Sequence, residues 1–253
     1  MKKNVMMRVA SIMLVLVLMS SSVISGTFAK YVTQGKATDS ARVAKWGVEF
    51  KSDVDGMFLK EYNYEPTPNG VTGQFSVEST EKVVAPGTKG EGYSFTTVHK
   101  DGTAPEVSYE VSFVLDDTSE NIFLGTYLPI EYKVTVGTTV IGSASHNFND
   151  LKDNLAKARY MYDVDEKQYY ISDDAGATWT PVGGPGDAAP EMVLSWEWPF
   201  EQGFDAEDTV LGYLVTGGYT LDQAKALAGF TGAIADYNLR IVLNVTATAT
   251  QID

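Results

Sequence analysis

The chain has 253 residues, and 33 acidic residues against 19 basic ones give it a formal net charge of −14. Such an acidic surface repels nucleic-acid phosphates and anionic lipid, so nucleic acid is not an expected partner. The chain contains no cysteine, which excludes disulfides, so the core alone must hold the fold. Its two histidines cannot complete a histidine-based zinc site.

The first 29 residues have the composition of a cleavable export signal. The uncharged run from Val9 to Met19 is shorter than the roughly 20 residues that a membrane-spanning helix needs. Small residues follow this run, and three positive charges precede it: Lys2, Lys3 and Arg8. These features predict a secretory signal peptide, with a retained membrane anchor as the alternative.

Cleavage is expected between Ala29 and Lys30, because Thr27 and Ala29 provide the small residues required at positions −3 and −1. Residues 30–253 would then form one secreted domain outside the cytoplasm. Loss of the three positive charges changes the net charge from −14 to −17. Contact with the membrane is expected only through the uncleaved signal.

Alternation of apolar and polar residues dominates the rest of the chain, which predicts an all-β fold. Strands with one apolar and one polar face indicate antiparallel sheets that cover a single core, as in a β-sandwich. The alternating stretches are 44–50, 93–97, 107–115, 130–136 and 239–249.

Helical patterns are few and short. Residue 149 is expected to cap one helix, and Asp205 to Val215 has the acidic first turn of another. Thr220 to Gln223 is a capping box that predicts a third helix, which Gly229 would end. Residues 30–40 are expected to be flexible, and about 145–190 are expected to form an insertion made of a helix and a β-hairpin.

Residues 172–179 match the Asp-box pattern S-x-D-x-G-x-T-W. In this motif a carboxylate accepts backbone N–H groups, a glycine takes the turn conformation, and a tryptophan packs over the loop. The matching residues are Ser172, Asp174, Gly176, Thr178 and Trp179. One copy without a blade repeat predicts a structural hairpin.

Calcium is the one cofactor that the acidic clusters suggest. Asp163, Asp165 and Asp174 offer carboxylate oxygens, which calcium prefers, but their spacing is not that of an EF-hand. Solvated hairpin tips are the other interpretation of the same residues.

No residue pattern indicates catalysis. His99 and His146 lie in different segments without an H-E-x-x-H motif, and no G-x-S-x-G elbow is present. Trp196, Trp198 and Phe200 alternate along one predicted strand. Such a row is more often sandwich core than a sugar-binding platform.

Several short stretches together resemble the TasA and camelysin family of exported Gram-positive proteins. The stretches are Gly26 to Tyr31, Asp39 to Trp46, Ala85-Pro86-Gly87, Leu194 to Phe200 and Asp208 to Gly212. The resemblance implies a jelly-roll sandwich, processing by a dedicated signal peptidase of the endoplasmic-reticulum type, and a role as a biofilm-matrix fibre subunit. A camelysin-type metallopeptidase and a carbohydrate-binding surface module are the alternatives, and no catalytic residue is carried over.

The resemblance also implies a way for subunits to join. Cleavage after Ala29 would free a segment of strand-forming residues that could complete the sheet of a neighbouring subunit. The expected donor residues are Lys30, Tyr31, Val32, Thr33 and Gln34, with Gly35 and Lys36 as a hinge. A disordered terminus is the alternative.

Overall fold

The structure is a computed structural model that describes residues 32–36, 47–53, 57–59, 82–99, 102, 104–199 and 203–252. The described residues from Thr33 onward form one compact unit. The predicted signal, its cleavage site, the donor residues Lys30 and Tyr31, and Phe200 lie outside the described residues. Within the described part, no helix is both long enough and apolar enough to cross a bilayer.

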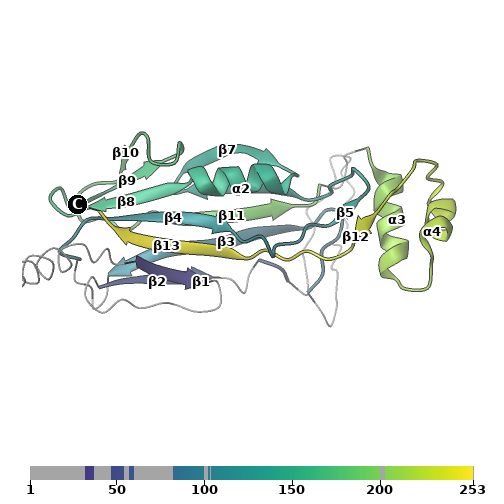
Figure 1. Cartoon of the computed structure of the whole chain (residues 1–253), viewed down its shortest axis with the longest axis horizontal. Helices are drawn as coiled ribbons and strands as arrows, with labels where there is room; N and C mark the ends of the chain where they lie inside the picture. The colour runs from purple at the N-terminus through teal and green to yellow at the C-terminus, as the bar shows by residue number, and fades with distance from the viewer. Residues whose placement is uncertain are drawn as a thin grey trace, which may run out of the picture. The chain divides into compact units, whose positions relative to one another are not determined.

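Two antiparallel sheets make up the unit (Figure 1), which confirms the prediction of an all-β sandwich. The six-stranded sheet has the order β1 (Val32–Lys36), β13 (Val245–Gln251), β4 (Tyr109–Leu115), β8 (Arg159–Asp163), β9 (Gln168–Ser172) and β10 (Thr180–Val182). The five-stranded sheet has the order β2 (Val48–Asp53), β3 (Lys89–His99), β11 (Met192–Glu197), β6 (Glu131–Val136) and β7 (Thr139–Ser145). A two-stranded sheet pairs β5 (Phe123–Leu124) with β12 (Tyr237–Asn238).

The core lies between the two large sheets, and it is built from the inward-facing residues of the alternating stretches. Along β4, Tyr109, Val111, Phe113 and Leu115 are buried, whereas the residues between them are partly or fully exposed. Phe113 meets Phe95 of β3 with ring centroids 6.0 Å apart, so aromatic rings join one sheet to the other. Period-two alternation therefore places apolar side chains inside, as expected for a sandwich.

The segment at about 145–190, predicted as an insertion of a helix and a β-hairpin, contributes strands to the six-stranded sheet. β8 pairs with β4 and β9 pairs with β8, so most of this segment is part of the six-stranded sheet. Tyr160, Tyr162 and Tyr169 bury their side chains in the common core. This burial is the physical reason that the segment integrates into the sandwich. Further toward the N-terminus, Val32–Lys36 of the predicted flexible stretch forms β1.

The last predicted strand begins later than its pattern suggests. Residues 239–244 form no continuous ladder, and β13 starts at Val245. An isolated backbone bridge and side chains hold the preceding segment. Val242 and Glu120 exchange two backbone hydrogen bonds of 2.8 Å. The Asn238 amide donates to the Arg240 carbonyl at 2.8 Å, and the Asn244 N–H donates to the Ser119 hydroxyl at 3.0 Å. The alternation at Leu239 and Ile241 continues, but these two residues turn toward a cavity described below.

In the described part of the chain three helices accompany the sheets, two of them within the predicted bounds. α3 (Asp205–Val215) has the predicted acidic first turn, and α4 (Leu221–Ala228) has the predicted capping box at Thr220 and ends at Gly229. α2 (Phe148–Lys157) is capped by Asn147 rather than by residue 149, because Asn147 takes the extended conformation and accepts the N–H two residues on. α2 packs against both sheets, whereas α3 and α4 pack together at the end of the sandwich away from the C-terminus (Figure 1).

Trp196 of β11 needs a gap in the neighbouring strand, and Gly90 of β3 provides it. The indole N–H of Trp196 donates to the Met57 carbonyl at 2.5 Å, deep in the core. A Cβ on Gly90 would lie 2.1 Å from the indole nitrogen and 2.6 Å from the Met57 oxygen. Neither atom can move without loss of a buried hydrogen bond, so only glycine fits there.

We therefore expect Gly90→Ala to destabilise the fold by more than about 4 kcal/mol, because a backbone carbonyl and a buried ring would both have to shift. Urea denaturation of the purified protein measures this cost. Gly184→Ala is the matched control: its Cβ would meet its nearest atom at 3.8 Å, so we expect a change within about 0.5 kcal/mol. Similar stabilities for the two variants would contradict the packing described here.

Candidate functional site

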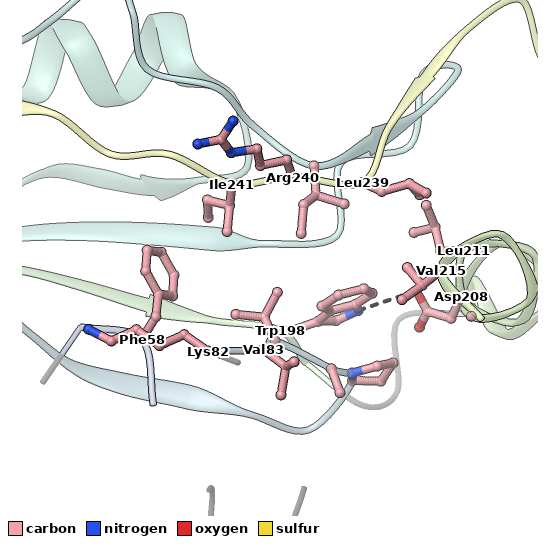
Figure 2. Close-up of a pocket in the computed structure, with 15 residues that line it drawn as sticks. Phe58, Lys82, Val83, Trp198, Asp208, Leu211, Val215, Leu239, Arg240 and Ile241 are labelled. Atoms are coloured by element: carbon pink, nitrogen blue, oxygen red, sulfur yellow. Dashed lines mark hydrogen bonds between the residues drawn. The ribbon is translucent and has the colours of Figure 1, made fainter. Parts of the chain in front are cut away.

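A cavity of about 760 Å³ opens between the 82–86 segment, the start of the 239–241 segment and helix α3 (Figure 2). Its volume lies within the range of small-molecule sites, about 300–1,000 Å³. Most of its lining is apolar, including Val83, Leu211, Val215, Leu239 and Ile241. Trp198 contributes an indole face, and Lys82, Asp208 and Arg240 contribute the charges.

Asp208 is the carboxylate of this cavity, and two donors hold it in place. Its Oδ1 accepts the Tyr127 hydroxyl at 2.6 Å and the Trp198 indole N–H at 3.2 Å. Burial raises the pKa of the Asp208 carboxyl, and the two hydrogen bonds oppose that shift. Burial and the nearby carboxylate also raise the pKa of the Tyr127 hydroxyl. The three side chains thus fasten α3 to the end of the five-stranded sheet.

The 85–88 turn is joined to the same tryptophan through the backbone. The Gly87 N–H donates to the Trp198 carbonyl at 2.7 Å, and the Trp198 N–H donates to the Thr88 carbonyl at 2.8 Å. Thr88 closes the turn by donating its hydroxyl to the Ala85 carbonyl at 2.6 Å. Stretches that lie far apart in the sequence, around positions 86, 198 and 208, therefore meet at one cavity.

An apolar wall with a few charged groups is the usual make-up of a ligand pocket. The described residues that line this cavity combine such a wall with the charges of Lys82, Asp208 and Arg240.

The Asp-box residues form a turn in the β9–β10 hairpin. Asp174 accepts the Thr178 N–H at 2.8 Å and the Thr178 hydroxyl at 2.6 Å, and it also accepts the Ser172 hydroxyl at 2.7 Å. Ala175 and Gly176 have φ values of 63° and 90°, and Trp179 packs beside Gly176. These hydrogen bonds lower the pKa of the Asp174 carboxyl to about 2.

The three calcium candidates do not come together. Asp163 lies at the β8–β9 turn, where its Oδ1 accepts the N–H groups of Asp165 and Glu166. Asp174 lies beyond the other end of β9, and its oxygens are engaged within the Asp-box turn. Among the described residues no group of three or more acidic, histidine or cysteine side chains is placed to hold a metal ion.

The tryptophans of the predicted row lie in the core, and the two histidines lie apart from each other. Trp196 and Trp198 are buried, with 2% and 4% of their surface exposed, so they belong to the core. His146 lies beside Glu131, with Nε2 3.8 Å from the carboxylate, at a second cavity of about 350 Å³. His99 lies on β3, within a network of tyrosines.

That network is a chain of hydroxyl groups between the two sheets. Tyr109 bonds to Thr97 at 3.1 Å and to Tyr169 at 3.0 Å, and Tyr169 continues to Nε2 of His99 at 3.0 Å. Tyr160 donates to Thr97 at 3.3 Å. Burial raises the pKa of the Tyr109 hydroxyl and lowers the pKa of the His99 imidazole. The hydroxyls therefore stay protonated and satisfy one another, which allows polar groups to cross the core.

Sequence reasoning missed most of the cavity residues, because no local motif marks them. Tyr127 and Lys82 lie in irregular segments, and only the fold brings them near Asp208 and Trp198. The alternation through Leu239 and Ile241 was visible but predicted a strand. The one available signal was that Ala85-Pro86, Trp198 and Asp208 to Gly212 belong to the stretches that carry the family resemblance.

Comparison with known proteins yields no match: no family model, no curated protein and no solved structure is similar to this chain.

The Asp-box turn predicts an unusually acidic aspartate. The folded-state pKa of Asp174 lies below its ordinary value of 3.8, so its contribution to stability is present above that value and is lost as the pH falls through about 2. Carboxyl-carbon NMR titration should report a pKa of about 2 for Asp174. Asp174→Asn should speed amide exchange at Thr178, whereas Asp173→Asn should not. An ordinary pKa would contradict the hydrogen-bonded turn.

His99 predicts a loss of stability at mildly acidic pH. Its pKa is lowered in the folded state from 6.5, so the unfolded chain binds the proton first. Stability should therefore fall as the pH drops below about 6.5 and continue to fall until the folded-state pKa is reached. We expect this slope in urea unfolding of the native sequence and a shallower slope in His99→Gln. The same slope in both proteins would rule out a contribution from His99.

Proposed function

We propose that the protein is a secreted structural subunit of a biofilm matrix or cell-surface fibre, a jelly-roll sandwich of the TasA and camelysin type. In this proposal a dedicated signal peptidase removes residues 1–29 outside the cytoplasm. The freed N-terminal segment then donates a strand, Lys30 to Gln34, to the sheet of a neighbouring subunit.

The observation that carries this proposal is the place of β1 in the six-stranded sheet. β1 (Val32–Lys36) is an edge strand of five residues beside β13, and it overlaps the predicted donor segment. A strand this short contributes few ladder bonds, so its exchange for an identical strand of another copy costs little. Without β1, the edge of β13 would present unpaired N–H and C=O groups to an incoming strand.

The opposite edge of the same sheet, formed by β10, is poorly suited to pairing with another strand, which leaves β13 as the edge of this sheet for joining subunits. β10 (Thr180–Val182) has three residues and includes Pro181, which lacks an N–H. Short edge strands and proline are common devices that prevent edge-to-edge pairing. Strand addition at β13 would therefore give a head-to-tail assembly with one kind of contact, and such heterologous contacts build open filaments.

The test compares protein that starts at Lys30 with protein that starts at Asp39, which lacks β1. The shorter form should remain folded by circular dichroism but form no fibres in electron microscopy, because it has no strand to donate. Fibres of undiminished length from the shorter form would overturn the proposal.

A synthetic peptide of residues 30–38 provides a second test, with a scrambled peptide as its matched control. Added to the longer form, it should occupy free β13 edges and shorten the fibres as its concentration rises. A peptide of the same composition in scrambled order should leave fibre length unchanged. Equal effects of the two peptides would show that assembly does not depend on this strand.

A further inference from the structure

The cavity at α3 separates its charges along its length. Asp208 lies at the α3 end against Trp198, and the basic side chains of Lys82 and Arg240 lie toward the other end, on the side of Phe58 and Ile241 (Figure 2). Lys82 and Arg240 are exposed, whereas Asp208 is partly buried. Apolar side chains line the space between these ends. One end of the cavity is therefore basic, the wall is apolar, and the α3 end carries a carboxylate that repels anions.

Gly212 is an exposed residue of α3 that lines this cavity without a side chain. It lies inside α3, where glycine costs about 1 kcal/mol relative to alanine. Its φ is not positive, and a Cβ built there would meet no atom within 4 Å. Neither backbone conformation nor close packing requires glycine at this position. Because Gly212 lines the cavity, a larger side chain there would fill it.

We infer that this cavity binds an amphipathic carboxylate, a molecule with an apolar chain and one anionic head group. The apolar tail of the ligand lies against Leu211, Val215 and Trp198, and its head group lies at the basic end near Lys82 and Arg240. Asp208 sets the orientation, because its negative charge disfavours a carboxylate at the α3 end. The volume of about 760 Å³ accommodates an acyl chain of fatty-acid length. The inference is independent of fibre assembly.

Quenching of tryptophan fluorescence by dibromostearate tests this inference, because bromine quenches an indole that it touches. We expect saturable quenching below the concentration at which the probe forms micelles. The chain has four tryptophans, so the test is made in a protein that carries Trp46→Phe. In that background Trp198→Phe should remove most of the quenching, since the Trp196 indole is hydrogen-bonded in the core and Trp179 lies on the Asp-box hairpin. No saturable quenching, or quenching that persists in full in Trp198→Phe, would overturn the inference.

Gly212→Leu tests whether the ligand binds in this cavity in a protein that should remain folded. A leucine at this helical position should keep or raise the melting temperature, because the backbone is compatible and leucine is a better helix former. It should also abolish saturable quenching by filling the space. Retained binding in a folded Gly212→Leu protein would show that the ligand lies elsewhere.

Comparing an anionic ligand with an uncharged one tests the role of the basic end of the cavity. Lys82→Ser with Arg240→Ser should weaken binding of dibromostearate roughly three- to tenfold, the effect of losing two exposed charge contacts. The same pair of changes should leave binding of the uncharged methyl ester unaltered. Lys133→Ser with Lys157→Ser is the matched control, because both lysines are exposed and neither lines the cavity. Equal losses for acid and ester, or equal losses in the control pair, would overturn the assigned orientation.

Discussion

Two buried indole rings, one on β11 and one directly after its end, organise this protein, because each ring carries an N–H that must find a partner away from water. Trp196 donates to the Met57 carbonyl and requires Gly90 opposite it. Trp198 donates to Asp208 and so brings α3 to the end of the sheet. β11 is also the central strand of its sheet, paired with β3 on one side and β6 on the other. The hydrogen bonds of the two indole N–H groups thus help to position the segment at Met57 and helix α3 against this strand.

The hydrogen bonds of Trp198 also explain how the cavity forms. Trp198 is joined to the 85–88 turn through its backbone and to α3 through its side chain, so both elements stand at fixed positions beside the sheet. The space left between them is lined by apolar residues, and Gly212 contributes no side chain to it. A rigid frame of this kind suits ligand binding, because little conformational freedom remains to be lost when a ligand enters.

A network of buried hydroxyl groups helps to align the two sheets in a chain that has no disulfides. Tyr109, Tyr160, Tyr169 and Thr97 bring hydroxyl groups between the sheets, and these groups bond to one another and to His99. A satisfied polar chain specifies one alignment of the two sheets, whereas apolar contact alone would tolerate several. The aromatic rings that carry the hydroxyls add large buried area at the same time. The sandwich therefore gains specificity from these side chains, in a chain that has no cysteine for covalent links.

The sequence alone determined the features that depend on near neighbours in the chain. Period-two alternation identified the main strands, the box at Thr220 identified α4, and the S-x-D-x-G-x-T-W pattern identified the turn around Asp174, because each depends on residues a few positions apart. Only the tertiary structure decided that the segment around β8 belongs to the sheet, since burial of Tyr160 depends on partners far along the chain. The same holds for the meeting of Lys82, Trp198 and Asp208 at one cavity and for the hydrogen bond from Tyr127 to Asp208, because contacts between distant segments leave no local pattern.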